Sequence, residues 1–129
     1  MRVFKTRWFV RFARKEGLTN HKLAEAIREI ESGLYEADLG GDLIKKRVAR
    51  TGEGKRGGYR TIIAYRKGNR AVFLYGFAKN EMANIGAREL QHFQKLARLF
   101  IGFSTTQIET AIKGEELQEI PEYGEEVPQ

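Results

Sequence analysis

The spacing of apolar residues predicts two helices near the start of the chain. In residues 6–16 the apolar positions at helical spacing are Trp8, Phe9 and Phe12, and the segment ends before Gly17. From Asn20 to Gly33 the apolar positions follow the i, i+3, i+4, i+7 pattern of a half-buried helix: Leu23, Ala26, Ile27 and Ile30. We expect a helical hairpin here, preceded by a short strand over Arg2–Lys5.

The middle of the chain is typical of a β-sheet. Residues 43–49, 59–65 and 70–78 are rich in β-branched and aromatic residues, and Gly68-Asn69 predicts a tight hairpin between the last two segments. Because these last two segments hold continuous apolar runs, we expect their strands to be covered on both faces. The segments 38–41 and 51–58 are rich in turn residues, and predict a turn and a flexible loop.

The last part of the chain predicts two more helices. The first runs from about Ala87 to Phe103, and Ser104 with Gln107 matches a capping box that begins the second. This order predicts an α+β fold, an antiparallel β-meander with the N-terminal helical hairpin packed on one face and with C-terminal helices. We expect one domain over residues 1–103 and a C-terminal helical extension with an acidic tail over 104–129.

Charge is unevenly distributed along the 129 residues. Residues 1–103 hold 22 basic and 10 acidic side chains, whereas residues 104–129 hold one lysine and seven glutamates. Within residues 45–79 there are eleven basic side chains and a single acid, Glu53. Such a concentration favours binding to a polyanion, because binding releases counterions. A solvated basic surface is the alternative interpretation.

The sequence argues against several classes of site. It has no cysteine, and its two histidines, His21 and His92, lie on different predicted helices, so we expect neither a metal site nor a cofactor. The glycine-rich segment 51–58 leads into a strand, unlike a P-loop or a dinucleotide-binding motif. No apolar run reaches about 18 residues and no secretory signal is visible, so we expect a cytoplasmic protein with no membrane partner.

Basic and aromatic residues alternate around the glycine-rich segment. Lys55, Arg56 and Arg60 are able to donate charge-assisted hydrogen bonds to a phosphate. The rings on which an RNA base would stack are those of Tyr59, Tyr65, Tyr75 and Phe77. This pattern favours single-stranded RNA over duplex DNA, because no predicted helix carries a concentrated basic face.

Two blocks of sequence, GKRGGYRTIIAY at 54–65 and YGFAKNE at 75–81, resemble the RelE/HigB-type toxins of bacterial type II toxin–antitoxin systems. These toxins belong to the RelE/ParE superfamily, and the order of elements over residues 1–103 is similar too. The resemblance implies a RelE-like microbial RNase fold and a ribosome-dependent mRNA endoribonuclease that inhibits translation. It also implies a cognate antitoxin, which we expect to be a small helix-turn-helix protein encoded next to the toxin.

The resemblance also implies roles for individual residues. Arg60 corresponds to the arginine that stabilises the scissile phosphate, and Lys79 to the lysine at the end of the last core strand. Lys46 and Arg47 fall near the family's catalytic lysines on the preceding strand. Asn80 stands where the best-studied branch has a catalytic arginine, and we include it among the RNA-binding residues.

The expected reaction is attack of a ribose 2′-hydroxyl on the adjacent phosphate, which gives a cyclic phosphate and a free 5′-hydroxyl without a metal ion. It needs a base, cations for the phosphorane and an acid for the leaving oxygen. The base is either a lysine among neighbouring cations or Glu81. Two alternatives stay open: a ParE-like protein that poisons DNA gyrase without cutting RNA, and a basic RNA- or ribosome-binding module without chemistry.

Overall fold

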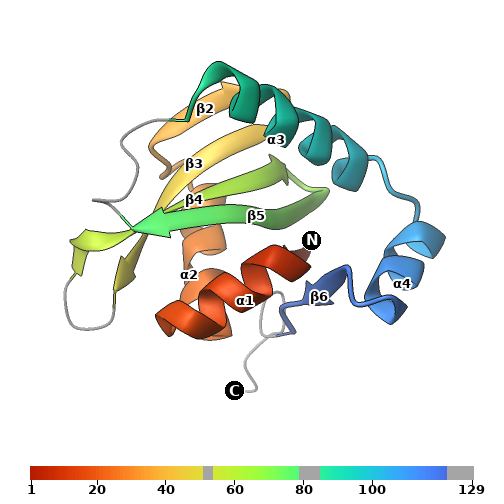
Figure 1. The fold of residues 1–129 in the computed structure, drawn as a ribbon, viewed down its shortest axis with the longest axis horizontal. Coiled ribbons are helices and arrows are strands. Elements are labelled where there is room, and N and C mark those ends of the chain that lie inside the picture. The colour runs from red at the N-terminus through yellow and green to blue at the C-terminus, as the bar shows by residue number, and fades with distance from the viewer. Residues whose placement is uncertain (51–53, 79–84, 122–129) are drawn as a thin grey trace.

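The protein folds into a six-stranded sheet with helices on both faces (Figure 1). The computed structural model describes residues 1–50, 54–78 and 85–121, with the backbone alone described at 50 and 54–57. The elements are β1 (Arg2–Thr6), α1 (Arg7–Glu16), α2 (Asn20–Glu31), β2 (Ala37–Gly40), β3 (Leu43–Arg50), β4 (Gly54–Arg66), β5 (Arg70–Ala78), α3 (Ala87–Ile101), α4 (Thr105–Lys113) and β6 (Leu117–Glu119). The predicted α+β class is confirmed.

The strands lie in the order β2-β3-β4-β5-β1-β6. β2 to β5 form the predicted antiparallel meander, with Gly68 at φ +75° in the tight turn between β4 and β5. The expected N-terminal strand is confirmed as β1, but it runs parallel to β5, with Arg2 opposite Arg70. A parallel neighbour needs a long connection, and here the chain from α1 to β4 supplies it.

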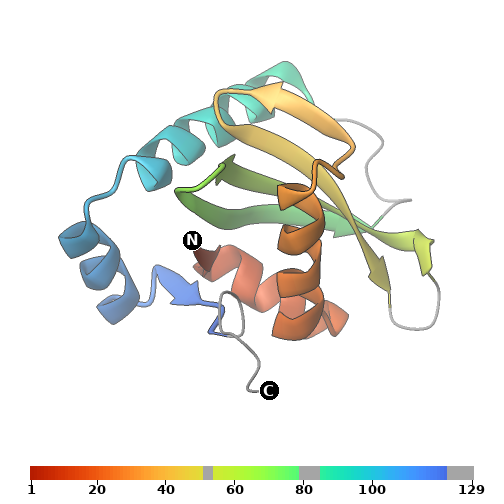
Figure 2. The ribbon, with the colours of Figure 1, turned by 180° about the vertical axis from the view of Figure 1, so that it is seen from behind.

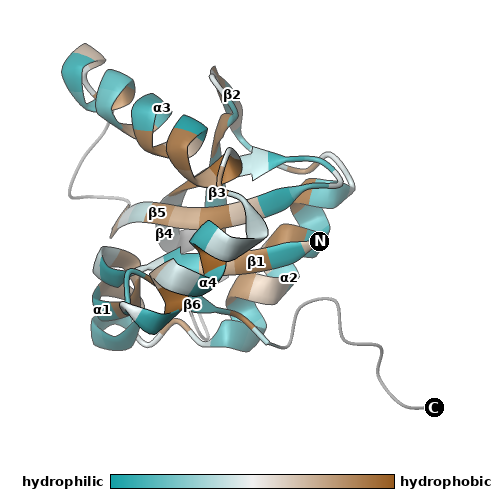
Figure 3. Ribbon diagram, turned by 90° about the vertical axis from the view of Figure 1, so that its right-hand side faces the viewer, coloured by the Kyte–Doolittle hydropathy of each residue, from teal (hydrophilic) through white to brown (hydrophobic). Residues whose placement is uncertain are grey.

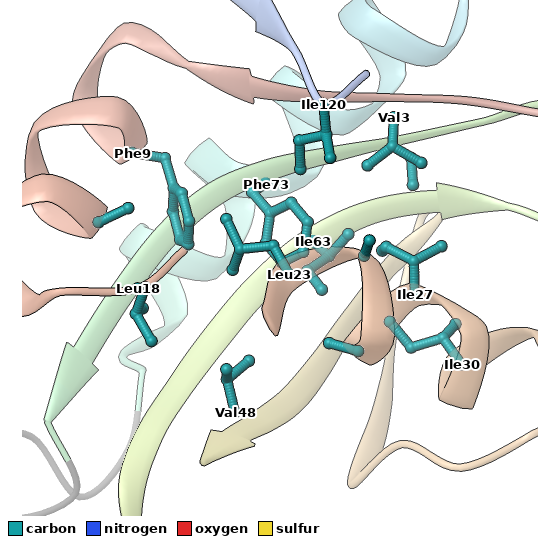
Figure 4. Packing of buried hydrophobic residues seen from close by; sticks show 14 of the residues in the cluster. Val3, Phe9, Leu18, Leu23, Ile27, Ile30, Val48, Ile63, Phe73 and Ile120 are labelled. Atoms are coloured by element: carbon teal, nitrogen blue, oxygen red, sulfur yellow. The ribbon is translucent and has the colours of Figure 1, made fainter. Parts of the chain in front are cut away.

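Side chains alternate between the two faces of the sheet, so the sheet supports two hydrophobic layers. α1 and α2 cover one face, where Phe9, Ile63 and Phe73 pack together (Figure 4). α3 and α4 cover the other, where Phe93 joins the cluster that contains Ile62. Figure 3 shows the sheet between α3 and the pair of N-terminal helices, and Figure 2, the view from behind, shows α2 in front of the sheet. β4 and β5 are therefore covered on both faces, as predicted.

The helices begin and end within two residues of the positions that the sequence predicts. Gly17 follows α1 at φ +73°, a left-handed conformation that glycine adopts without strain. Thr19 caps α2 by accepting a hydrogen bond from the backbone N–H of Lys22. Ser104 and Gln107 form both hydrogen bonds of a capping box at the start of α4. In the parts of the chain that the structure describes, every helix is too short or too polar to span a membrane.

The predicted turn at 38–41 is wrong in its position. β2 covers Ala37–Gly40, and the turn lies at Gly41 and Asp42, both at positive φ. The short strand forms because it pairs with β3, where Ala37 lies opposite Lys45. Pairing with a neighbouring strand outweighs the weak strand propensity of Asp and Gly in isolation.

The predicted loop over 51–58 is wrong from residue 54 onward. β4 begins at Gly54, which is paired with Arg50 of β3. This pairing outweighs the weak strand propensity of Gly54, and the ladder is irregular between Tyr59 and Gly54.

The segment after residue 103 belongs to the same sheet and core. β6, which the sequence analysis did not predict, pairs with β1 and places Glu119 opposite Phe4. Arg2 holds this strand through two hydrogen bonds of 2.8 Å, from Nε and Nη2 to the two carboxylate oxygens of Glu119. Ile108 of α4 is fully buried in the layer under α3. The expected boundary after residue 103 therefore does not separate two hydrophobic cores.

Candidate nucleic-acid interface

Alternation of side chains along β3 determines which of its cations lie together. Lys46 and Val48 point to the face that α2 covers, because Lys46 binds Glu29 of α2 and Val48 belongs to the layer under α1 and α2. Lys45 and Arg47 therefore point to the opposite face, which carries α3. Both are partly exposed there.

Arg47 and Arg60 form a cross-strand pair on the α3 face. They are directly opposite each other in the β3–β4 ladder, and Arg60 is two residues from Ile62, which packs in the layer under α3. Residues opposite each other in an antiparallel pair have Cα atoms about 4.5 to 5.5 Å apart, and their side chains share a face. The two arginine side chains therefore leave the sheet from neighbouring positions on the same face.

Each member of this pair has a hydrogen-bond donor without a partner. Nε of Arg47 and Nη1 of Arg60 are buried, and no acceptor in the described part of the chain binds them. Leaving a buried donor unpaired costs about 1 to 3 kcal/mol, and two like charges side by side repel each other. A phosphate would remove both costs, because its oxygens accept hydrogen bonds from two guanidinium groups. The pair is therefore a candidate phosphate site.

Lys46 does not join this pair. Its Nζ lies 2.6 Å from Oε1 of Glu29, and its side chain is 2% exposed. The backbone carbonyl of Lys46 accepts a hydrogen bond of 2.8 Å from the hydroxyl of Thr61. Lys46 and Arg47, which we expected to act together, thus point to opposite faces of the sheet. Lys45 is the lysine on the face of Arg47, and strict two-residue alternation from Leu43 is the signal that would have found it.

Phe77 and Tyr75 of β5 lie on the same face as Arg60. Phe77 is opposite Arg60 in the β4–β5 ladder, and a bulge at Leu74 brings Tyr75 to this face as well. The ring centre of Tyr75 lies 6.1 Å from that of Phe77 and 5.1 Å from that of Phe93 in α3. The structure thus places two of the predicted RNA-binding aromatic residues next to the arginine pair.

Tyr59 lies on the other face and has a structural role. Its hydroxyl donates a hydrogen bond of 2.8 Å to Oε1 of Glu16 at the end of α1. Its ring meets Phe12 edge to face at 5.7 Å, and the residue is 2% exposed. A buried ring in this position fixes α1 against β4 and offers no surface on which a base would stack.

Several predicted site residues lie outside the described residues. They are Lys79, Asn80 and Glu81, and the side chains of Lys55 and Arg56. Their roles stay predictions from the sequence.

The two histidines do not lie together in the structure. His21 of α2 and His92 of α3 are both exposed and lie on elements that cover opposite faces of the sheet. Within 1–50, 54–78 and 85–121, no group of three or more His, Cys, Asp or Glu side chains is placed to hold a metal ion.

The fold is that of a basic α+β protein, and the arginine pair is its candidate phosphate site. A model of one protein family, described as the RelE toxin of the RelE / RelB toxin–antitoxin system, matches residues 1–120. The chain belongs to the RelE toxin family; it is a toxin of a toxin–antitoxin system, which implies a cognate antitoxin as its partner. The match includes α4 and β6. A search of curated proteins finds no match to this chain.

Proposed function

We propose that this toxin is a ribosome-dependent endoribonuclease that cuts mRNA and thereby inhibits translation. The observation that carries the proposal is the pair formed by Arg47 and Arg60, whose unpartnered donors share one face of the sheet. Toxins of the RelE family are generally ribonucleases, which agrees with a phosphate as the ligand of this pair.

In the proposed reaction the ribose 2′-oxygen bonds to phosphorus, and the bond from phosphorus to the 5′-oxygen of the next nucleotide breaks. Negative charge increases on the non-bridging oxygens as the phosphorane forms. Arg47 and Arg60 donate N–H groups to these oxygens, so they stabilise the transition state more than the substrate. Because arginine stays protonated in proteins, the pair acts through charge and hydrogen bonds and moves no proton.

Proton transfer requires two further groups, one that takes the 2′ proton and one that protonates the 5′-oxygen. Lys79 and Glu81 are the groups predicted from the sequence for these steps. Lys45 is a further candidate, because it lies on the face of Arg47 and two positions from Arg60 along the ladder, opposite Ile62.

The proposal is tested by expressing the toxin in a bacterium and mapping the 5′ ends of transcripts. We expect new ends that carry a 5′-hydroxyl, and Arg60→Ala to lower the cutting rate by about 100- to 1000-fold, the usual effect of removing a transition-state donor. Arg98→Ala, an exposed arginine on α3, is the matched control and should cut normally.

Equal cutting by Arg60→Ala and Arg98→Ala would contradict the proposed mechanism. Loss of DNA supercoiling with intact transcripts would favour the gyrase poison. Salt-sensitive RNA binding with intact transcripts would favour the binding module.

A further inference from the structure

The edge of β5 beyond β1 is open. β1 pairs with β5 only as far as Lys5 opposite Phe73, whereas β5 continues to Ala78. On this side, residues 74–78 have no strand partner in the described residues, and the Thr6 hydroxyl reaches the Leu74 carbonyl at 3.4 Å. An open strand edge leaves backbone donors and acceptors available to a ligand.

α1 lies beside this open edge and borders a hollow. Phe12 lies so close to the strand that a Cβ on Gly76 would come within 2.5 Å of its ring, so the glycine is required there. The remaining space, about 330 Å³, is lined by Trp8, Arg11, Phe12, Lys15, Tyr75 and Phe77, together with Glu16 and Gly76. We call this space the β5-edge hollow. Its volume suits a single nucleotide-sized group rather than a duplex.

The hollow combines aromatic rings with positive charge. The ring of Trp8 lies 4.4 Å from that of Tyr75, and Trp8 is 39% exposed. Arg11 and Lys15 are one helical turn apart on the exposed side of α1 and form no ion pair with a described residue. The one acid, Glu16, accepts the hydrogen bond from the Tyr59 hydroxyl. Rings and cations together are the surface that single-stranded nucleic acid prefers.

The hollow also adjoins the arginine pair. Phe77, which lines it, is the cross-strand neighbour of Arg60, and neighbouring strands lie about 4.8 Å apart. A strand of RNA whose phosphate meets Arg60 would therefore reach the hollow within the next nucleotides.

We propose that the β5-edge hollow binds a nucleotide of single-stranded RNA flanking the cleavage site, with its base against Trp8 and Tyr75 and its phosphate between Arg11 and Lys15. This proposal rests on the proposed function, because the RNA is taken to pass over Arg60. It assigns a binding role to Trp8, which the sequence analysis counted only among the apolar positions of a helix, and to α1 as a whole.

The test uses the chain's only tryptophan as a reporter. The probe is a short end-labelled oligoribonucleotide whose 2′-hydroxyls are methylated, so it cannot be cut by 2′-hydroxyl attack. Anisotropy of the label reports binding anywhere on the protein, and Trp8 emission reports a base at the hollow. We expect both signals to change at the same RNA concentration.

Variants separate the hollow from the rest of the surface. Arg11→Ala/Lys15→Ala should weaken binding by about tenfold or more, since two phosphate contacts are lost. Arg98→Ala/Lys113→Ala is the matched control, because it removes the same charge at the opposite end of the molecule from the end of β5 (Figure 1). Trp8→Ala should weaken binding by about 5- to 100-fold, the range measured for loss of one stacked base. If this variant misfolds, Arg11→Ala/Lys15→Ala still tests the hollow, because both of its side chains are exposed.

RNA binding without a change in Trp8 emission, and equal affinity of the two double variants, would overturn this inference while leaving the proposed function intact. Quenching of Trp8 by RNA in a protein that cuts no transcript would support the hollow and contradict the proposed function. Quenching by a protein partner but not by RNA would overturn the inference and identify the hollow as a protein-binding surface.

Discussion

At the scale of single residues, Lys45, Lys46 and Arg47 show how one position along a strand changes the role of a cation. Lys46 is buried against Glu29 with its ammonium 2.6 Å from the carboxylate. Its neighbours project to the other face, where Arg47 meets Arg60. We therefore expect Lys46 to contribute to stability, and Lys45 and Arg47 to RNA binding.

Replacement of Lys46 by Met should separate these roles. Removing one partner of a buried ion pair costs about 3 to 5 kcal/mol. We expect the unfolding free energy to fall by about 3 kcal/mol or less, because the side chain of Glu29 is 25% exposed and keeps access to water. Urea unfolding measures the loss. The folded variant should cut RNA normally, whereas Lys45→Met should keep its stability and bind RNA more weakly. A cutting defect in folded Lys46→Met would contradict this assignment.

At the scale of elements, a few polar side chains attach the C-terminal elements to the sheet. Nη1 of Arg70, at the start of β5, donates to the carbonyls of Phe100, Ile101 and Phe103 at the end of α3, at 2.8 to 3.2 Å. A cation at a helix C-terminus also interacts favourably with the helix dipole. Burial lowers the pKa of Arg70, with a smaller contribution from the nearby charge of Arg2.

Arg70→Ala should therefore loosen α3. We expect a loss of about 1.5 to 3 kcal/mol in unfolding free energy, the usual worth of a hydrogen bond to a charged group. Hydrogen exchange should increase first in the last turn of α3, and Lys67→Ala, an exposed cation in the preceding turn, is the control. Uniform exchange along the whole chain would contradict a local role.

The attachment of β6 should depend on pH. The bidentate hydrogen bond from Arg2 lowers the pKa of Glu119, with a further contribution from the charge of Arg2. A carboxyl whose pKa is lower in the folded state stabilises the fold above its unfolded value, about 4.5, and loses that contribution as the pH falls through the folded value.

Glu119→Gln tests this dependence. Its deficit in unfolding free energy relative to the parent should be largest above pH 5 and should shrink toward pH 3, because protonation removes the same charge from the parent. Urea unfolding across this range measures both proteins. A deficit that is constant with pH would contradict a role for the ionised carboxylate.

The sequence predicts those parts of the fold that local rules determine. Gly17 and the capping box of Ser104 lie where propensity and capping predict them. Features that depend on residues distant in the sequence were not predicted. They include β6, which pairs with the N-terminal strand, and the parallel pairing of β1 with β5. For the site, the basic and aromatic pattern indicated Arg60, and the family resemblance indicated both Arg60 and Arg47. Their pairing depends on the register of β3 and β4, which the predicted loop over 51–58 does not fix.

At the scale of the whole molecule, charges are sorted between the two ends of the sheet. The chain has a net charge of +6, and two of its C-terminal glutamates, Glu109 and Glu119, bind Arg2 beside β1 and β6. The acidic C-terminal elements are thus placed at one edge of the sheet, whereas Arg47 and Arg60 lie on β3 and β4, away from that edge. A positive surface of this kind steers a polyanion toward the arginine pair.

The central claim is that Arg47 and Arg60 act on one and the same phosphate, and a double-mutant cycle tests it most directly. Single-turnover cleavage of a ribosome-bound mRNA is measured for Arg47→Ala, Arg60→Ala and the double variant. We predict that each single change lowers the rate by about 100-fold and that the double change costs clearly less than the product of the two, because the donors share their ligand. Independent effects that multiply, or a single variant that cuts at the parent rate, would contradict the claim.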